Sequence, residues 1–279
     1  MILYNGAYLP KEEVRISYQD RGYYFGDGVY EVFRIYDGEF YELDAHLHRL
    51  SLSAEGIRMD LPYTLDEISR MCHKLLEANR HVVNGTLYLQ ITRGIAPRSH
   101  VLPDHPTPTL LAYCQSVERP LRAMDQGVSA VTIADTRWLH CDLKTLNLLP
   151  NTLAKQHAVD QQADEAILHR DGMVTECSAA NVMIVKNGQL YTHPANHLIL
   201  HGITRAVILR LAHELGIPSH EQPFDLATLQ TADEVFITGT TVELTPVVQI
   251  DHTAVSDGRP GPITRQLQQA FSGTIPKKQ

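Results

Sequence analysis

Lys144 and Glu176 are the two residues whose types could support covalent chemistry. Lys144 lies in an apolar stretch, residues 138–149, and an amine in such a frame can be neutral enough to form a Schiff base with an aldehyde cofactor. Glu176 lies in residues 174–181, and a carboxylate can hold the ring nitrogen of that cofactor protonated. Together they indicate a pyridoxal phosphate enzyme, whereas a lysine considered alone is most often a solvated surface charge.

Four leucines flank this lysine: Leu143, Leu146, Leu148 and Leu149. An ammonium group that is buried among apolar side chains needs a partner or a chemical use, because burying an unpaired charge is costly. We therefore expect the chain around Lys144 to be largely buried.

Two further segments have the donors that a phosphate needs. Residues 202–204 open a predicted helix, where free N–H groups and the Thr204 hydroxyl meet the positive end of the macrodipole. Residues 239–241 form a small-residue turn, for which ordinary turn chemistry is the more frequent explanation. Arg49, which has leucine neighbours on a predicted helix, either points inward as the cation or is an ordinary surface arginine.

A carboxylate could be bound by the loop at residues 97–100. Arg98 can grip a carboxylate with two hydrogen bonds, and His100 could add another donor. Tyr30 could supply a phenolic hydroxyl. Taken alone, the loop is typical of a solvated turn, so its assignment depends on the rest of the sequence.

The composition excludes several classes of protein. The chain has 279 residues, 43% of them hydrophobic, and a net charge of −8 without a run of Lys or Arg, so we expect no nucleic-acid partner. No stretch of about 18 apolar residues occurs, and the N-terminus lacks a basic region before an apolar one, which predicts no membrane association and a cytoplasmic location. The 4 cysteines and 15 histidines have no ligand spacing, so we expect no metal and reduced thiols.

Residues 1–115 are predicted to form an α+β domain rather than a βαβ array. Strong signals are the Asp-Gly turn at 37–38 and the capping box at 64–67. The predicted elements are strands at 32–36, 39–43, 87–91 and 110–114 and helices from about 44 and from 65. A short, polar, proline-containing segment follows, and we interpret residues 116–121 as an interdomain linker.

Residues 122–279 are predicted to form the second domain, which would bind the cofactor. Turn signals at 171–172 and 187–188 predict two hairpins in it. The other predicted elements are strands at 128–133, 165–169 and 235–238 and helices at 151–162, from 202 and at 263–271.

Three blocks of the sequence resemble the D-amino-acid aminotransferases, which are fold type IV pyridoxal phosphate enzymes. Residues 20–31, 142–149 and 175–182 look like the N-terminal signature, the lysine segment and the third block of that family. The first and third blocks are shared across fold type IV, whereas residues 97–100 are similar to the D-amino-acid branch. The likeness runs almost end to end. It implies a two-domain α+β fold, with a smaller N-terminal α/β domain and a larger C-terminal β-barrel-like domain with helices.

The resemblance also implies roles around the cofactor, pyridoxal 5′-phosphate. Lys144 would be the Schiff-base lysine and would carry the proton between Cα and C4′, and Glu176 would partner the pyridine nitrogen. Leu200 would pack beside the ring. The residues implied to hold the phosphate are Arg49, Ile203, Thr204 and Thr240. Gly239 stands where the family pattern has a hydroxyl residue, so that phosphate contact stays open.

For the substrate, the resemblance implies a carboxylate trap made by Tyr30, Arg98 and His100. Arg98 and His100 would reach across from a second subunit, which implies a homodimer. The implied reaction is transamination of D-amino acids, D-alanine and 2-oxoglutarate giving pyruvate and D-glutamate with ping-pong kinetics. The alternatives are another fold type IV enzyme, such as an aminodeoxychorismate lyase or a branched-chain or amine aminotransferase, and a non-catalytic cofactor-binding protein.

Overall fold

Residues 1–276 are described by the computed structural model, and they divide into two units. The first unit comprises Met1–Glu118, Leu143–Leu148 and Pro276, and the second comprises Arg119–Asp142 and Leu149–Ile275. The boundaries expected from the sequence, with a linker at 116–121, stay a prediction, and residues 277–279 lie outside the described part of the chain.

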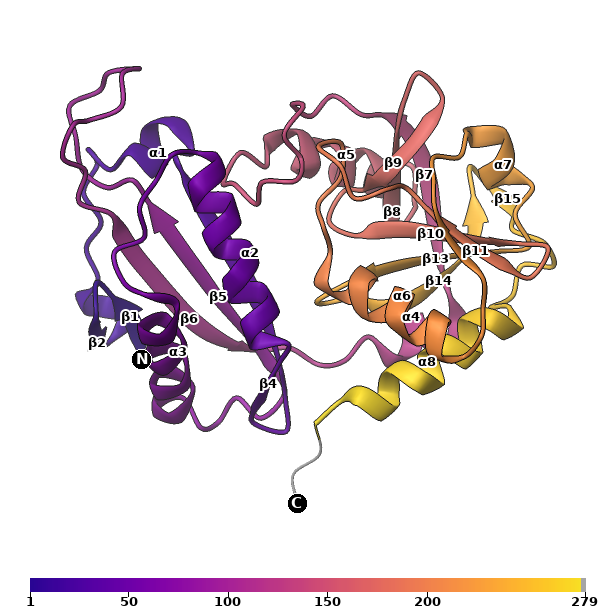
Figure 1. Ribbon diagram of the computed structural model, residues 1–279, viewed down its shortest axis with the longest axis horizontal. Coiled ribbons are helices and arrows are strands. Elements are labelled where there is room, and N and C mark those ends of the chain that lie inside the picture. Colours follow the sequence, from indigo (N-terminus) through magenta and orange to yellow (C-terminus); the bar gives the residue numbers. More distant parts are fainter. Residues whose placement is uncertain (277–279) are drawn as a thin grey trace. The chain divides into compact units, whose positions relative to one another are not determined.

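The first unit is built on one antiparallel sheet with strand order β2-β1-β6-β5-β3-β4. Its strands are β1 (Ile2–Tyr4), β2 (Ala7–Leu9), β3 (Gly28–Tyr36), β4 (Glu39–Tyr41), β5 (Gly85–Thr92) and β6 (Thr109–Ser116). Its helices are η1 (Lys11–Glu13), α1 (Arg21–Phe25), α2 (Leu43–Gly56) and α3 (Leu65–Ala78). Helices α2 and α3 lie over one face of the sheet, and the apolar cluster of this unit fills the layer between them (Figure 1).

Local chemistry explains the turns and helix ends of the first unit. Asp37 and Gly38 have φ of 49° and 82°, which is the backbone of a tight two-residue hairpin between β3 and β4. The Thr64 hydroxyl accepts from Glu67 N, and the Glu67 carboxylate accepts from Thr64 N, so the predicted capping box at the start of α3 is confirmed.

Alternation along β3 separates two kinds of side chain. Val29, Glu31 and Phe33 are fully buried on the face that α2 covers, whereas Tyr30 and Val32 lie on the opposite face and are half-buried. Because successive side chains of a strand point to opposite faces, β3 places the Glu31 carboxylate under α2 and the Tyr30 phenol on the other face of the sheet.

The second unit holds a nine-stranded sheet with order β12-β11-β10-β13-β14-β7-β8-β9, and β15 pairs with β14. Its strands are β7 (Val128–Ala134), β8 (Glu165–Arg170), β9 (Met173–Cys177), β10 (Asn181–Lys186), β11 (Gln189–Thr192), β12 (Ser219–Glu221), β13 (Glu234–Gly239), β14 (Glu243–Ile250) and β15 (Thr253–Ala254). Its helices are α4 (Leu121–Gln126), α5 (Leu149–Asp160), α6 (Ile203–Glu214), α7 (Leu226–Gln230) and α8 (Pro262–Thr274).

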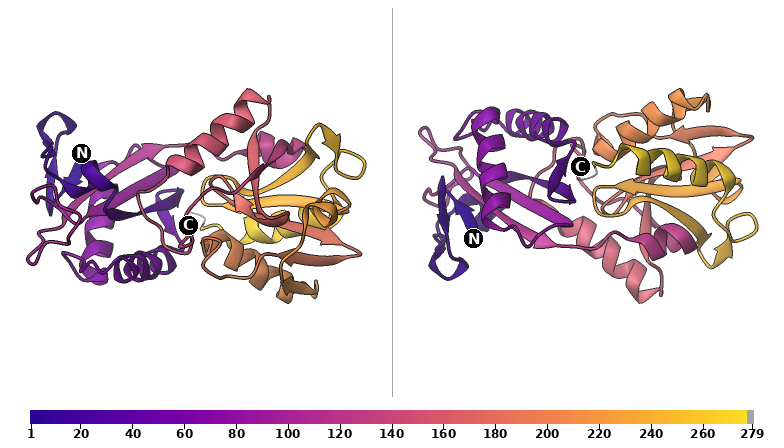
Figure 2. Two further views of the ribbon diagram at one scale, coloured as in Figure 1. Left: turned by 90° about the horizontal axis from the view of Figure 1, so that it is seen from above. Right: turned by 90° about the horizontal axis from the view of Figure 1, so that it is seen from below.

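This larger sheet curls on itself. Strand β9 is the last in the hydrogen-bonded order, yet it packs beside β10, which follows it after a tight turn. Ile167, Val182 and Ile237 from three different strands therefore share one apolar cluster inside the curl. Helices α6 and α8 pack against each other and on β13, while α5 packs on β7 and β8 (Figure 2). The α+β class and the barrel-like larger domain are thus confirmed.

Most predicted elements are present, with ends that move by a few residues. The strand β14 is not among the predictions, because Glu243, Thr245 and Pro246 interrupt the apolar pattern that marks a strand. Glu243 and Thr245 are nevertheless buried, since β13 and β7 flank β14 on its two sides. Tertiary burial therefore decides this strand where its own pattern does not.

Within the described residues, no group of three or more His, Cys, Asp and Glu side chains is arranged to hold a metal ion. None of the described helices has the length and apolar character needed to cross a membrane.

Candidate active site

Lys144 is anchored to the first unit through its backbone. Tyr30 N donates to Lys144 O at 3.1 Å, and Lys144 N donates to the Ser53 hydroxyl on α2 at 3.0 Å. Leu146 N donates to Gly28 O at 3.0 Å, which extends this short pairing with β3. A Cβ on Gly28 would lie 2.6 Å from the backbone oxygen of Ile91 on β5 and 2.8 Å from a Leu146 methyl group, so a glycine is needed where β3 lies between β5 and the lysine segment.

The side chains of Lys144 and Tyr30 come together. The Lys144 ammonium lies 4.3 Å from the centre of the Tyr30 ring, over its face. The expectation of a largely buried chain around Lys144 is wrong. Lys144 is only partly buried, none of its four leucine neighbours is fully buried, and Leu149 is 69% exposed. Leu149 is the first residue of α5 and lies beyond the segment that pairs with β3, which is why it is the most exposed of the four leucines.

Arg49 points into the first unit and is buried, which resolves the choice between an inward and a surface arginine. Its Nε and Nη2 donate to Glu31 at 2.7 and 2.8 Å, and Glu31 also contacts His46 Nδ1 at 2.8 Å. Burial alone would raise the pKa of Glu31, but the charge and hydrogen bonds of Arg49 and the contact with His46 outweigh it and lower this pKa to about 2. The same burial lowers the pKa of His46.

Arg98 and His100 lie in an exposed loop of the first unit. The Arg98 guanidinium lies 5.3 Å from the Phe25 ring centre, and the His100 ring lies 5.5 Å from it. Within the described chain, neither residue makes a polar or ring contact with Tyr30 or Lys144. The three predicted substrate residues are therefore not gathered within one copy of the chain.

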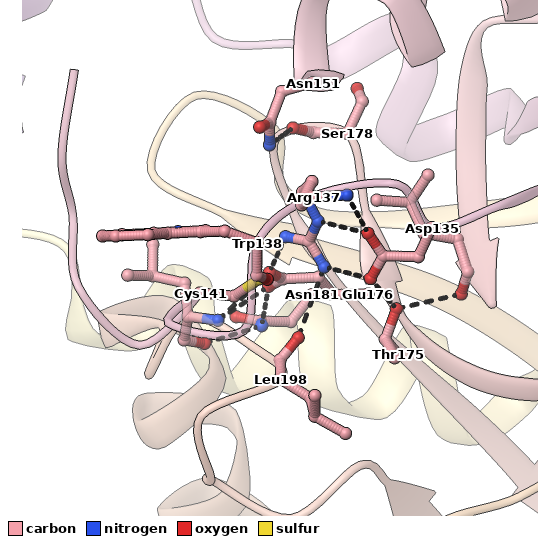
Figure 3. A network of polar contacts seen from close by, with 12 residues as sticks. Asp135, Arg137, Trp138, Cys141, Asn151, Thr175, Glu176, Ser178, Asn181 and Leu198 are labelled. Carbon is pink, nitrogen blue, oxygen red and sulfur yellow. Dashed lines mark hydrogen bonds and ion pairs between the residues drawn. The ribbon is translucent and has the colours of Figure 1, made fainter. Parts of the chain in front are cut away.

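Glu176 is the centre of a polar network in the second unit (Figure 3). Asn181 Nδ2 donates to Glu176 Oε2 at 2.9 Å, Leu200 N donates to both carboxylate oxygens at 3.1 Å, and Arg137 Nη1 donates to Oε1. A carboxylate has about four acceptor positions. Three donor groups make these four contacts because the Leu200 N–H is shared between both oxygens. A fourth donor, such as the N–H of a protonated pyridine ring, would fit where Leu200 N bonds to one oxygen alone.

The environment of Glu176 makes its charge costly. Burial raises its pKa to about 6, and the charge of Arg137, its hydrogen bond and the Leu200 N–H offset only part of that effect. An additional cationic donor would stabilise the ionised carboxylate. The predicted neighbours Glu176 and Leu200 are thus brought together, and the chemistry of the carboxylate fits a cofactor with a basic ring nitrogen.

The predicted phosphate donors Ile203 and Thr204 form the first turn of α6, close to the same network. Asn181 Nδ2 also donates to Leu200 O at 2.9 Å, and a Cβ on Gly202 would collide with Asn181 Oδ1. Only glycine therefore lets the start of α6 approach the side chain that holds Glu176.

Thr240 follows β13 in the turn after Gly239, and the preceding Thr238 pairs with Asn181 across the sheet. Thr238 is buried, yet its hydroxyl has no hydrogen-bond partner among the described residues. An unpaired buried hydroxyl needs an explanation, and a bound polar group is one. The second unit thus brings donors for a phosphate near Glu176, whereas Arg49 belongs to the first unit.

Several residues of these networks are absent from the predicted set. Glu31 lies within the block at residues 20–31, and Asn181 lies within the block at 175–182, but neither is assigned a role there. Asp135 and Arg137 directly follow β7, and such a charged pair just after a buried strand is a signal that could have found them.

Comparison with known proteins assigns the family. The family model described as amino-transferase class IV matches residues 28–250. The chain belongs to the class IV amino-transferases. A D-alanine aminotransferase of Staphylococcus epidermidis is 48% identical over 98% of this chain and 97% of its own length. A D-alanine aminotransferase of Listeria monocytogenes is 49% identical over 97% of this chain and 94% of its own length.

Solved structures agree on the fold. A branched-chain amino acid aminotransferase from Escherichia coli has a TM-score of 0.90 at 29% identity and covers 98% of this chain and 92% of its own. A second branched-chain amino acid aminotransferase, solved in complex with N-(5′-phosphopyridoxyl)-L-glutamate, has a TM-score of 0.90 at 28% identity, with 99% of this chain and 95% of its own covered.

Proposed function

We propose that the protein is a pyridoxal phosphate-dependent transaminase of D-amino acids. It would convert D-alanine and 2-oxoglutarate into pyruvate and D-glutamate, with an amino acid and a 2-oxo acid binding in turn. The observation that carries this proposal is the nearly full-length similarity to D-alanine aminotransferases at 45–49% identity. The phosphopyridoxyl ligand bound to one of the branched-chain relatives supports pyridoxal 5′-phosphate as the cofactor.

When bound, pyridoxal phosphate supplies an aldehyde and a protonated ring that withdraws electrons from the substrate carbon. Glu176 would accept the ring N–H, and Leu200 would pack beside the ring. The residues that would hold the phosphate are Arg49, Ile203, Thr204 and Thr240. The first turn of α6 favours an anion for two reasons, its N–H groups and the positive end of the helix dipole.

Lys144 would hold the cofactor and move a proton between the substrate Cα and the cofactor C4′. Its backbone is fixed by β3 and α2, so the base of the side chain would stay in place while the amine at its end moves between these atoms. Tyr30 lies against this amine and would restrict its orientation.

Tyr30, Arg98 and His100 would bind the substrate carboxylate. The absence of contacts between Tyr30 and the exposed loop within the described chain supports a loop supplied by a second copy, and the protein would then be a homodimer. A fixed carboxylate orients the Cα–H bond for proton removal. A cytoplasmic location belongs to the same proposal.

The rival function keeps Lys144 and Glu176 and changes the substrate. The solved structures of branched-chain aminotransferases share 28–29% identity with this chain, and a 4-amino-4-deoxychorismate lyase of Legionella pneumophila shares the fold at 21%. The higher identity to D-alanine aminotransferases favours the D-amino-acid reaction over both.

A donor panel tests the proposal. Purified holoenzyme is offered D-alanine, L-alanine, L-leucine and aminodeoxychorismate separately, with 2-oxoglutarate where an acceptor is needed. We expect pyruvate from D-alanine at a rate at least tenfold above that from L-alanine, and no pyruvate from D-alanine would refute the assignment. Release of pyruvate from aminodeoxychorismate instead would establish the lyase.

Lys144→Ala tests the central residue. We expect turnover to fall by at least about a thousandfold, because the covalent and proton-transfer roles are both lost. Borohydride reduction of the wild-type holoenzyme followed by peptide mapping should place the cofactor on Lys144. A label on another lysine would contradict the assignment even if the variant were inactive.

A further inference from the structure

Two residues outside the predicted site lie next to Glu176: Arg137 contacts its carboxylate, and Asp135 binds Arg137 (Figure 3). Arg137 Nε and Nη2 donate to the two oxygens of Asp135 at 2.9 and 2.8 Å, and Arg137 Nη1 donates to Glu176 Oε1. Nη2 also reaches Leu198 O at 3.3 Å. The guanidinium is therefore fixed along both of its edges and presents a single nitrogen to Glu176.

We propose that Asp135 and Arg137 are positioning residues, which orient the Glu176 carboxylate so that it faces the ring nitrogen of the cofactor. The inference rests on the role proposed above for Glu176. Neither residue would touch the cofactor ring in this arrangement, since each acts through the carboxylate.

Asp135, which holds Arg137, is itself held by other residues. The side chain of Asp135 is fully buried and accepts from Arg170 Nε and from the Thr175 hydroxyl, each at 3.1 Å. Arg137 N also donates to Asp135 Oδ1 at 3.0 Å. These bonds restrict the rotation of Asp135 and therefore of Arg137. The Glu176 carboxylate thus receives one charged donor, Arg137, and two neutral donors, Asn181 Nδ2 and Leu200 N.

The charges in this cluster explain why two arginines are present. Asp135 and Glu176 carry two negative charges, and Arg137 and Arg170 carry two positive ones, so the cluster is neutral before any ligand binds. A single arginine shared by two buried carboxylates would leave a net negative charge in a dry site, which is costly. Arg170 thus compensates Asp135, and Arg137 remains available to Glu176.

The test compares two ligands that differ only at the ring nitrogen. Full-length protein freed of cofactor is titrated with pyridoxal 5′-phosphate and with its 1-deaza analogue, in which C–H replaces the ring nitrogen. Binding is followed by the fluorescence of Trp138, the one tryptophan of the chain. The ratio of the two dissociation constants isolates the contact at the ring nitrogen, because phosphate and aldehyde contacts cancel.

We expect the wild-type protein to bind pyridoxal phosphate at least tenfold more tightly than the analogue, and Arg137→Gln to reduce this ratio at least tenfold. A wild-type ratio near one would refute the role of Glu176 itself. A large wild-type ratio that Arg137→Gln leaves unchanged would overturn only the positioning inference, so the two failures are distinguishable.

Arg119→Gln is the matched control. Arg119 also forks a buried glutamate in the second unit, donating to the two oxygens of Glu243 at 2.9 and 2.7 Å. Arg119→Gln removes a comparable ion pair without affecting Glu176, so the ratio of the two dissociation constants should stay at the wild-type value. A fall in the ratio as large as that of Arg137→Gln would mean that general loosening, not positioning, is responsible.

Two milder variants keep the test informative if Arg137→Gln does not fold. Arg137→Lys retains the charge but not the fork, and we expect a ratio between those of wild type and Arg137→Gln. Asp135→Asn releases the far edge of Arg137, and we expect the ratio to fall about threefold. If Arg137→Lys kept the wild-type ratio of dissociation constants, the two-nitrogen contact of Arg137 with Asp135 would not be needed. If Asp135→Asn kept it, Asp135 would have no positioning role.

Discussion

Glu31 in the first unit and Glu176 in the second are both buried glutamates beside an arginine, yet their pKa values move in opposite directions. The pKa of Glu31 is lowered to about 2, whereas that of Glu176 is raised to about 6. Burial pushes both values upward, so the difference lies in how much positive charge each carboxylate receives.

The two arginines use their guanidinium groups differently. Arg49 directs two nitrogens at Glu31, which also receives His46, so this carboxylate is well compensated in the folded state. Arg137 gives its fork to Asp135 and only one nitrogen to Glu176. The charge of Glu31 is therefore strongly stabilised in the folded protein, whereas Glu176 receives less direct charge stabilisation and would gain from a further donor.

The largest effect expected from this contrast is the loss of stability in Glu31→Gln. The amide leaves Arg49 buried without its counter-charge, so we expect the free energy of unfolding to fall by about 3–5 kcal/mol. Urea denaturation measures it. Glu55→Gln, an exposed change on α2, is the control and should cost less than about 0.5 kcal/mol. Equal stability of the two variants would contradict a structural role for Glu31.

Glu176→Gln should show the reverse pattern. Arg137 keeps Asp135 as its partner, so we expect the unfolding free energy of the cofactor-free protein to change by less than about 1 kcal/mol. Turnover with D-alanine should fall about a hundredfold, because the charge that keeps the ring protonated is lost. Steady-state kinetics and urea denaturation measure the two effects. If Glu176→Gln lost stability but kept normal turnover, Glu176 would be the structural carboxylate, contrary to the contrast with Glu31.

The pH dependence of stability should also differ in sign between the two carboxylates. The folded pKa of Glu31 lies below its ordinary value of 4.5, so its stabilisation is present above 4.5 and is lost as the pH falls toward 2. The folded pKa of Glu176, about 6, lies above 4.5, so the folded state holds the extra proton and its advantage is lost as the pH rises from 4.5 through 6.

Unfolding of the cofactor-free protein between pH 4.5 and about 7 tests the behaviour expected of Glu176. The loss of stability over that window should be about 2 kcal/mol larger in wild type than in Glu176→Gln, which has no carboxyl to titrate at that position. Parallel stability curves for the two proteins would show that Glu176 titrates as an ordinary glutamate.

The smallest predicted effect separates recognition of the substrate from recognition of the ring. Arg98→Ala should raise KM about tenfold for amino acids and leave simple amines unchanged, through loss of a bidentate contact with the carboxylate. Arg80→Ala, which removes another exposed arginine of the first unit, is the control. Equal losses for amino acids and amines would place Arg98 outside the carboxylate trap.

Short stretches of the chain were enough to predict local structure and the family. The Asp-Gly turn at 37–38 and the capping box at Thr64 are local signals, and both elements form at the predicted positions, because their geometry depends on neighbouring residues alone. Lys144 and Glu176 could be identified for the same reason, since short segments of the sequence contain the residue types that the cofactor chemistry needs.

How these residues are held depends on folding. Lys144 pairs with Tyr30, and Gly202 lies against Asn181, although the members of each pair are far apart in the sequence. Arg137 and Asp135 are close in the sequence, but the fold turns their side chains toward each other. The charge state of a buried carboxylate depends on the partners that folding brings within about 3 Å, and no pattern along the sequence records those distances. Glu31 and Glu176 therefore carry the same side chain but acquire different chemistry from their surroundings.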